Sequence, residues 1–272
     1  MLSINVMGGL GNQLFQIFTA IAYSMRYKTE IKLPINKPDI TTRPHYWNTF
    51  LKNLKPILTN NPPIHFIKLN EYSHEYTEIA YIPLNFTLCG YYQSYKYFEE
   101  EYENICKLIQ LEEQKDEVKK KIDFDISDCV SLHFRIGDYK NIQDCHPIMP
   151  INYYYNSINN IINETGKIDW KILYFYEKQD TEDVNNFINV LQNKYPSMEF
   201  ISVNHTFHDY EQMLLMSMCS HNIIANSTYS WWGAYFNSNK EKKVCYPYKW
   251  FGPSLDKNVK DMFPSHWIKI NY

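Results

Sequence analysis

The chain has 272 residues, of which 44% are hydrophobic and 17% aromatic. This composition excludes global disorder, a collagen repeat and a coiled coil, and the length predicts two domains. The net charge of −3 provides no broad positive field for nucleic acid or an anionic membrane, so we expect no nucleic-acid partner, and any anionic ligand needs a local site.

The first residues, Met1 to Met7, lack the basic region and the long apolar run of a secretory signal. No later segment has the ~18 uninterrupted apolar residues of a spanning helix. We therefore expect no integral membrane segment and a cytoplasmic location. The six cysteines include no Cys-x-x-Cys pair, which favours reduced thiols.

The first half of the chain begins with a strand, a turn and a helix. The pattern predicts the strand at Leu2–Met7, the tight turn at Gly8–Asn12 and the helix at Gln13–Tyr27. Prolines and poor periodicity between Asn36 and Pro83 predict loops and short helices. A further strand, a helix and a charged linker are predicted at Leu88–Tyr91, Tyr95–Ile109 and Gln110 to Asp125.

In the second half, strands and helices alternate, which predicts a parallel sheet with helices on both faces. Ligands of such sheets bind beyond the carboxyl ends of the strands, so the loops near Gly8, Arg135 and Asn226 are of most interest. The predicted strands are Cys129–Phe134, Lys171–Tyr176, Glu199–Val203, Asn222–Ala225 and Lys243–Tyr246. The predicted helices are Asn152–Asn163, Thr181–Lys194, Tyr210–Cys219 and Ser230–Asn237.

Three of the eight glycines of the chain lie in the Gly8–Asn12 loop, between the first strand and helix. Glycine permits positive φ and close approach of a ligand, and the following helix offers unpaired N–H groups. The dinucleotide fingerprint is incomplete, because Leu14 stands where its third glycine is expected. A nicotinamide cofactor is therefore disfavoured, and a tight turn without a ligand stays an alternative.

The strand Cys129–Phe134 runs directly into Arg135. Alternation places His133 and Arg135 on the same side of the strand, at its carboxyl end. The planar guanidinium fork suits a diphosphate. The alternatives are a structural ion pair between Arg135 and Asp138, and a core role for His133.

The third loop follows the strand Asn222–Ala225. Ser230 is a candidate N-cap of the next helix, and small hydroxyls with backbone N–H groups form an oxygen-binding nest. We interpret Trp231 and Trp232 as core residues rather than as a sugar-stacking face. The amide and hydroxyl side chains of this loop are Asn226, Ser227, Thr228 and Ser230.

Four segments together resemble glycosyltransferase family 11, the α-1,2-fucosyltransferases. They are Gly8 to Gln16 (GGLGNQLFQ), Gly90 to Phe98 (GYYQSYKYF), His133 to Tyr139 (HFRIGDY) and Leu215 to Ala234. The order and joint presence of these motifs make the resemblance more specific than any one of them. It spans nearly the whole chain.

The resemblance implies a GT-B fold, in which two Rossmann-like domains face each other across a cleft. Residues 1–125 would form the acceptor-side domain and residues 126–272 the domain that binds the nucleotide sugar. The reaction implied is inverting transfer of L-fucose from GDP-β-L-fucose to a galactoside-type glycan in α-1,2 linkage. No metal is expected, because cationic side chains and backbone N–H groups would take the leaving charge.

The same resemblance implies roles for individual residues. Arg135 would stabilise the leaving diphosphate, and Asn12 would face the reacting sugar or the acceptor. Asp138 is a candidate general base, with Asp144 and His146 as alternatives, and a dissociative route without a base is also open. The donor-binding residues would be Gly9, Gly11, His133, Arg135, Glu211, Asn226, Ser227, Thr228 and Ser230.

The sequence departs from the family pattern at two positions. Ile136 replaces the usual second arginine, and Gln212 stands where related fucosyltransferases place an aspartate for guanine, with Glu211 preceding it. A carboxylate accepts from both adjacent donors of guanine, whereas an amide offers one oxygen. A donor with another base or another deoxysugar, and a non-catalytic binding protein of the same fold, therefore stay open as alternatives.

Overall fold

The computed structural model describes residues 1–35, 44–61, 66–255 and 257–272. The chain divides into two compact units. Unit 1 comprises Met1–Asp116 and Lys257–Pro264, and unit 2 comprises Glu117–Asp256 and Ser265–Tyr272. Both units combine helices with parallel strands, so the predicted α/β class is confirmed. The facing of two domains across a cleft stays a prediction.

Unit 1 contains two small parallel sheets among its described residues. One has the strand order β1-β5-β4, and the other pairs β2 with β3. Leu2 lies opposite Phe86, which in turn lies opposite Ile67, so the register continues across the larger sheet. The strands are β1 Leu2–Ile4, β2 Leu33–Pro34, β3 Leu58–Thr59, β4 Ile67–Asn70 and β5 Phe86–Cys89.

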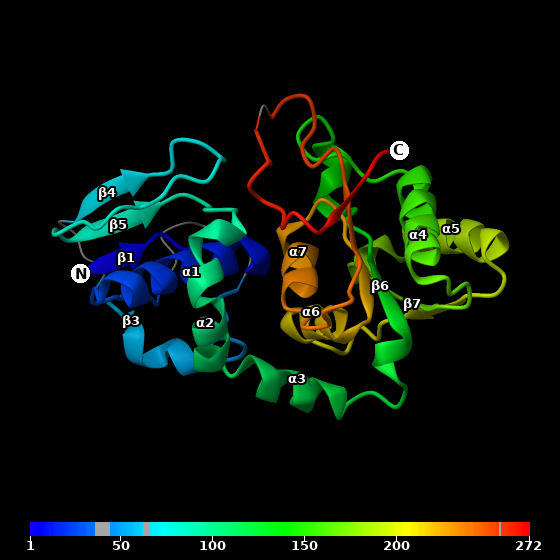
Figure 1. Ribbon diagram of the computed structural model, residues 1–272, viewed down its shortest axis with the longest axis horizontal. Coiled ribbons are helices and arrows are strands. Elements are labelled where there is room, and N and C mark those ends of the chain that lie inside the picture. Colours follow the sequence, from blue (N-terminus) through cyan, green and yellow to red (C-terminus); the bar gives the residue numbers. More distant parts are fainter. Residues whose placement is uncertain (36–43, 62–65, 256) are drawn as a thin grey trace. The chain divides into compact units, whose positions relative to one another are not determined.

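The longest helix of unit 1 is α1, Leu10–Tyr27, which lies beside β1 (Figure 1). Apolar side chains at helical spacing, such as Leu14, Phe15 and Phe18, are fully buried. The helix begins three residues before the predicted start, because Gly9 has the extended conformation of an N-cap and its carbonyl accepts the Gln13 N–H at 3.0 Å. The predicted turn at Gly8–Asn12 is thus partly wrong.

Other predictions for unit 1 also need correction. The predicted helix Tyr95–Ile109 is two 3₁₀ turns, Tyr95–Tyr97 and Glu99–Glu101, followed by α2, Tyr102–Ile109. The region from 36 to 83 contains the 3₁₀ helix Lys52–Ile57 as expected, but also β3 and β4. The parts of that prediction on residues 36–43 and 62–65 lie outside the described residues. The helix α3, Leu111–Lys119, forms much of the predicted linker.

Unit 2 is built on a parallel sheet with the strand order β11-β10-β9-β6-β7-β8 among its described residues. The alternation predicted from the sequence is confirmed, apart from shifts of one or two residues at element ends and the unpredicted β11. The strands are β6 Cys129–His133, β7 Lys171–Phe175, β8 Glu199–Ser202, β9 His221–Ile223, β10 Val244–Pro247 and β11 Ile268–Ile270. The helices are α4 Ile151–Thr165, α5 Thr181–Lys194, α6 Asp209–Met218 and α7 Thr228–Tyr235, with 3₁₀ turns at Ile126–Asp128, Gly137–Asn141 and Lys178–Asp180.

The helices of unit 2 cover both faces of this sheet (Figure 1). On one face, Val130 and Leu132 of β6 pack in an apolar cluster with α4 and α5. On the other, Ser131 accepts a hydrogen bond from Asn222 Nδ2 at 2.7 Å, and the same nitrogen donates to the Met216 carbonyl of α6. This alternation sends His133 towards the α6 and α7 side.

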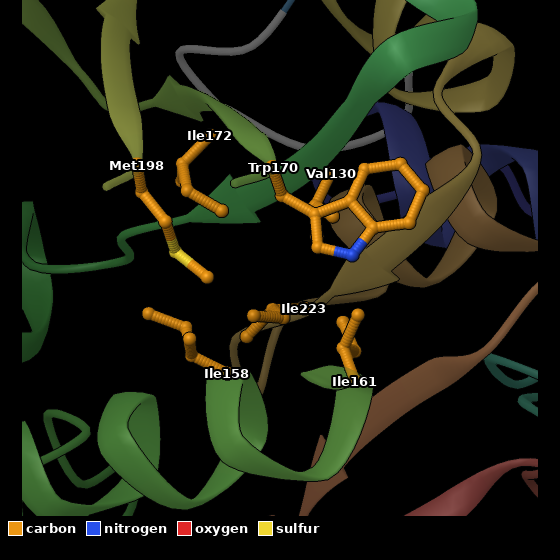
Figure 2. Close-up of a pocket in the computed structure, with 7 residues that line it drawn as sticks. All are labelled: Val130, Ile158, Ile161, Trp170, Ile172, Met198 and Ile223. Carbon is orange, nitrogen blue, oxygen red and sulfur yellow. The ribbon is translucent and has the colours of Figure 1, made fainter. Parts of the chain in front are cut away.

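A small gap lies inside the apolar cluster of unit 2 (Figure 2). The side chains around it come from α4, from strands of the sheet and from the residues just before β7 and β8. The Trp170 indole donates to Thr165 Oγ1 at 3.3 Å. The gap is therefore part of the core and lies apart from the polar strand ends. Its lining residues are Val130, Ile158, Ile161, Trp170, Ile172, Met198 and Ile223.

Candidate functional site

The carboxyl ends of β6, β7 and β9 carry polar side chains in unit 2, among them the predicted donor-binding residues His133 and Asn226. His133 is the last residue of β6, Glu177 follows β7, and Asn226 follows β9. Because these strands are neighbours and parallel, their carboxyl ends lie along one edge of the sheet.

His133 is 6% exposed, and its ring lies 5.5 Å from that of Tyr229 on α7. Burial, and to a smaller extent the charge of Arg135, lower the pKa of His133 to about 3. The imidazole is therefore neutral near pH 7. Its Nδ1 has no hydrogen-bond partner among the described residues, so a ligand at the strand end would satisfy a buried polar atom.

Arg135 is held by two carboxylates and one aromatic ring. Its Nη1 donates to Glu177 and its Nη2 to Asp138, and the guanidinium carbon lies 5.0 Å from the centre of the Tyr139 ring. Burial disfavours its charge, but the carboxylates of Glu177 and Asp138 outweigh this effect and raise the pKa of Arg135. The ion pair with Asp138 that the sequence left open is present.

Glu177 was not predicted as a site residue, because it follows β7 without any motif that marks it. Together with Asp180 it shapes the loop after β6: the Asp180 carboxylate accepts the Gly137 N–H at 2.8 Å. Asp180 is 2% exposed, and burial raises the pKa of its carboxyl. Gly137 has a φ of 27°, a conformation that disfavours residues with a Cβ.

Asn226 joins three loops at this edge of the sheet. Its Nδ2 donates to the carbonyls of Pro147 and Trp250 at 3.0 and 3.2 Å, and its own carbonyl accepts from the Tyr139 hydroxyl at 3.1 Å. Asn226 is 2% exposed, and its Oδ1 lacks a hydrogen-bond partner in the described part of the chain. Asn226 therefore holds the loops in place, and its Oδ1 is a buried acceptor that a ligand could satisfy.

The helix α7 begins at Thr228, with Ser227 as its N-cap residue, so the prediction of Ser230 as the N-cap is wrong. Ser230 is fully buried, and its hydroxyl donates to the carbonyls of Ala225 and Ser227. Trp231 and Trp232 are fully buried, which confirms their core role. Ser227 is 8% exposed, and its contact with a donor, like those of Thr228 and Ser230, stays a prediction.

Glu211 and Gln212 lie in the first turn of α6. Glu211 accepts from Lys121 Nζ at 2.5 Å and from the His208 N–H at 2.8 Å, which completes a capping box. Glu211 thus has a structural role, and a contact with guanine stays a prediction. Gln212 donates its Nε2 to the Phe207 carbonyl at 3.0 Å.

The glycine-rich loop lies in unit 1. Gly8 has a φ of 78°, and a Cβ there would stand 2.7 Å from Asn12 Nδ2, so both conformation and close approach require glycine. At position 9 neither reason for glycine applies, since a Cβ there would meet no atom within 4 Å. Gly11 lies inside α1. Gln13 donates to the Gly8 carbonyl at 3.0 Å and fixes the loop.

The candidate bases lie in different surroundings. The Asp138 side chain is 61% exposed and pairs with Arg135. The Asp144 carbonyl accepts the Ser254 N–H at 2.9 Å, and the His146 ring stacks 4.9 Å from that of Tyr139. These contacts do not single out one base.

The described residues contain no group of three or more His, Cys, Asp and Glu side chains placed to hold a metal ion. Asp123 and Asp125 form an Asp-x-Asp pair in the sequence. The Asp125 carboxylate accepts from the backbone and hydroxyl of Ser127, which explains this aspartate as a cap of the 3₁₀ turn.

Within the described ranges, none of the helices is long and apolar enough to span a bilayer.

Comparison of the sequence with known proteins identifies the family of the chain. The sequence profile of Glycosyl transferase family 11 matches residues 1–271. An alpha-1,2-colitosyltransferase of Escherichia coli is 25% identical over 287 aligned residues, which cover 97% of this chain and 96% of that protein.

Two further similarities are partial. The O-antigen biosynthesis glycosyltransferase WbnK of E. coli is 33% identical over 156 residues, which are 56% of this chain and only about half, 48%, of that protein. The solved ADP-heptose lipopolysaccharide heptosyltransferase II of E. coli aligns with a TM-score of 0.40 and 13% identity, over 58% of this chain and 43% of that one. The profile match, which spans nearly every residue, confirms the resemblance of the motifs: the chain belongs to glycosyltransferase family 11.

Proposed function

We propose that this chain is an inverting glycosyltransferase that moves L-fucose from GDP-β-L-fucose to a galactoside-type glycan in α-1,2 linkage. The observation that carries the proposal is the family match over residues 1–271, joined to a cation at the carboxyl end of β6. Arg135 would bind the donor diphosphate and stabilise the leaving GDP.

The surroundings of Arg135 support this role. The guanidinium side chain is 15% exposed, so its charge acts with little screening by water. In the structure Glu177 and Asp138 occupy the donor nitrogens of Arg135. A diphosphate would replace one or both carboxylates, because two of its oxygens can accept side by side from the guanidinium fork. The buried Nδ1 of His133 and Oδ1 of Asn226 would then find partners on the donor.

The proposal also specifies which sugar is transferred. One relative is named an alpha-1,2-colitosyltransferase, so a related deoxysugar is the second candidate. The test is to incubate the purified chain with GDP-fucose, a nucleotide-activated colitose or UDP-galactose, together with galactoside acceptors. Release of free nucleotide and mass spectrometry of the product identify the sugar, and NMR identifies the linkage.

A non-catalytic binding protein is the alternative of a different class. The replacement of a second arginine by Ile136 suggested it, but Ile136 is 3% exposed and packs in the apolar cluster with α4 and α5. The side chain at this position points into the core. Saturable binding of a donor without release of nucleotide would favour the alternative.

The proposed mechanism needs no metal ion, because Arg135 and backbone N–H groups would take the leaving charge. Transfer should therefore continue at an unchanged rate in excess EDTA. The rate of product formation is measured before and after chelation, and then with added Mg²⁺ or Mn²⁺. Loss of activity in EDTA that either ion restores would refute a metal-free mechanism.

Gln212 is the residue that we expect to recognise the guanine base of the donor. Its Nε2 is engaged by Phe207, so its oxygen is the atom that would accept from guanine. Gln212→Asp should tighten GDP binding, since a carboxylate accepts from both guanine donors. Glu211→Gln should leave the GDP Kd unchanged, but lower the free energy of unfolding by about 1–2 kcal/mol, a value reduced because Lys121 is 53% exposed.

Calorimetry with GDP, UDP and ADP measures these affinities, and urea unfolding measures the stability. If Glu211→Gln weakened GDP binding at unchanged stability, Glu211 would be the base-reading residue instead. Equal GDP affinity in the wild type and both variants would exclude this segment as the guanine site.

A further inference from the structure

We infer that Gln93 is a positioning residue for the transfer reaction: it fixes the amide of Asn12, and His74 fixes Gln93 in turn. The inference rests on the proposed function, since Asn12 is the residue expected to face the reacting sugar or acceptor. It also explains why the motif Gly90 to Phe98 accompanies the glycine-rich loop, although the two are far apart in the sequence.

The three side chains form a continuous hydrogen-bonded row in unit 1. Gln93 Nε2 lies 2.9 Å from Asn12 Oδ1, and Gln93 Oε1 lies 3.1 Å from His74 Nε2. Gln93 is 7% exposed, so these hydrogen bonds face little competition from water. The sequence separations of 81 and 19 residues show that tertiary structure, and not a local turn, brings the groups together.

The hydrogen bond from Gln93 Nε2 to Asn12 Oδ1 fixes the other donor and acceptor of this row. Gln93 donates to Asn12 with its nitrogen, so its oxygen must accept, and His74 must carry a proton on Nε2. Burial lowers the pKa of His74 to about 4, so near pH 7 the ring is neutral and has this one tautomer. As a consequence, Asn12 Oδ1 is turned towards Gln93, and its Nδ2 is the end turned towards Gly8.

The backbone around the row is shaped to hold it. Asn12 Nδ2 lies so close to Gly8 that a Cβ there would approach it to 2.7 Å. On the other side, the Glu71 carboxylate accepts the N–H groups of Tyr91 and Tyr92 at 2.7 and 3.0 Å and fixes the turn before Gln93. Gly90 is required there, since its Cβ would stand 2.3 Å from Glu71 Cβ.

An oriented Asn12 amide presents N–H donors, and N–H donors bind hydroxyl, ring or phosphate oxygens. Without Gln93, the amide could rotate and present its oxygen in their place. Gln93 therefore acts on the reaction through Asn12, by selecting the donor end of the amide for the reacting sugar or acceptor oxygen.

The test is a double-mutant cycle on the full chain. Gln93→Met keeps the side-chain length but removes both hydrogen bonds, and should lower kcat about ten- to a hundredfold, with the donor KM changed less than threefold. In an Asn12→Ala background the same substitution should change kcat less than twofold, because the residue it positions is gone. Equal losses of kcat in the two backgrounds would overturn the inference.

Gln114→Met is the matched control. Gln114 Nε2 donates to the carbonyls of Phe50 and Ile109 at 3.1 and 2.7 Å, so this variant also removes partly buried hydrogen bonds within unit 1. It should lower the melting temperature without lowering kcat. A comparable loss of kcat in Gln114→Met would show that general loosening of unit 1, and not orientation of Asn12, explains the effect of Gln93.

An NMR measurement separates this inference from the proposed function. In the wild type, the His74 ring should show a proton on Nε2, and the two Asn12 amide protons should give sharp, separate signals. In Gln93→Met the Asn12 signals should broaden or merge. If they do not change, the positioning role is wrong even in an active enzyme. If they change as expected in a chain that transfers no sugar from any donor tested, the row is confirmed and the proposed reaction is the part that fails.

Discussion

Arg135→Lys is expected to lose about 2–4 kcal/mol of transition-state stabilisation, roughly 30- to 900-fold in kcat/KM. Lysine keeps the positive charge, but its ammonium group is a single point and cannot bind two oxygens side by side. The guanidinium now spans Glu177 and Asp138 and stacks on Tyr139. A shorter, non-planar head group would lose that geometry as well as the diphosphate.

Donor kinetics with purified variants check this expectation, at a temperature below the melting transition of both proteins. Lys140→Met is the control, because Lys140 lies in the same loop and its Nζ pairs with Asp183 at 2.7 Å, away from Arg135. It should keep wild-type kinetics. Unchanged donor kinetics in Arg135→Lys would remove Arg135 from the mechanism.

Acid should destabilise unit 2 through His221, the first residue of β9. Burial, with smaller effects of Lys243 and Lys167, lowers the pKa of His221 to about 4 from an ordinary value of 6.5. The unfolded chain therefore binds a proton at His221 before the folded chain does. The stability linked to neutral His221 is complete above pH 6.5 and is lost as the pH falls towards 4, by about 3 kcal/mol.

The structural cause is a contact that protonation would break. His221 Nδ1 accepts the Lys243 N–H at 3.0 Å, and the ring packs edge-on against Trp170 at 4.9 Å. His221→Asn keeps an acceptor near this position but does not titrate in this range. Urea unfolding at several pH values between 7 and 4 should show a steeper loss in the wild type than in the variant. Parallel losses would mean that His221 does not control the acid sensitivity.

Much of unit 2 could be predicted from the sequence, because its elements carry strong local signals. The prediction of a helix at Thr181–Lys194 is confirmed at both ends, since apolar residues recur at helical spacing and acidic residues fill the first turn. By contrast, β11 was not predicted: Ile268–Ile270 is short, and its pairing with β10 comes from tertiary structure. In unit 1, β4 was missed because most of Ile67–Asn70 is exposed, so no alternation of apolar and polar residues marks it.

The residues of the candidate site also divide into those with a local sequence signal and those whose role depends on tertiary structure. Arg135 and His133 were found because they end a clear apolar strand and match a motif. Glu177 and His74 were missed because their roles depend on neighbours that are distant in the sequence. Ser230 was wrongly predicted as the N-cap of α7. In the sequence alone, a serine two residues inside a helix cannot be distinguished from a serine that caps it.

Residues Lys257–Pro264 belong to unit 1, although the whole of 117–256 precedes them. Asp261 there binds Lys96 Nζ at 2.5 Å and accepts the Tyr76 N–H at 3.1 Å, and its carbonyl accepts from the Ser94 hydroxyl. During synthesis from the N-terminus, Ser94, Lys96 and Tyr76 would lack these contacts until Asp261 has left the ribosome. Unit 1 would thus stay incomplete while residues 117–256 of unit 2 are made, and a fragment that stops at residue 116 would lack the segment that secures the Gln93 motif.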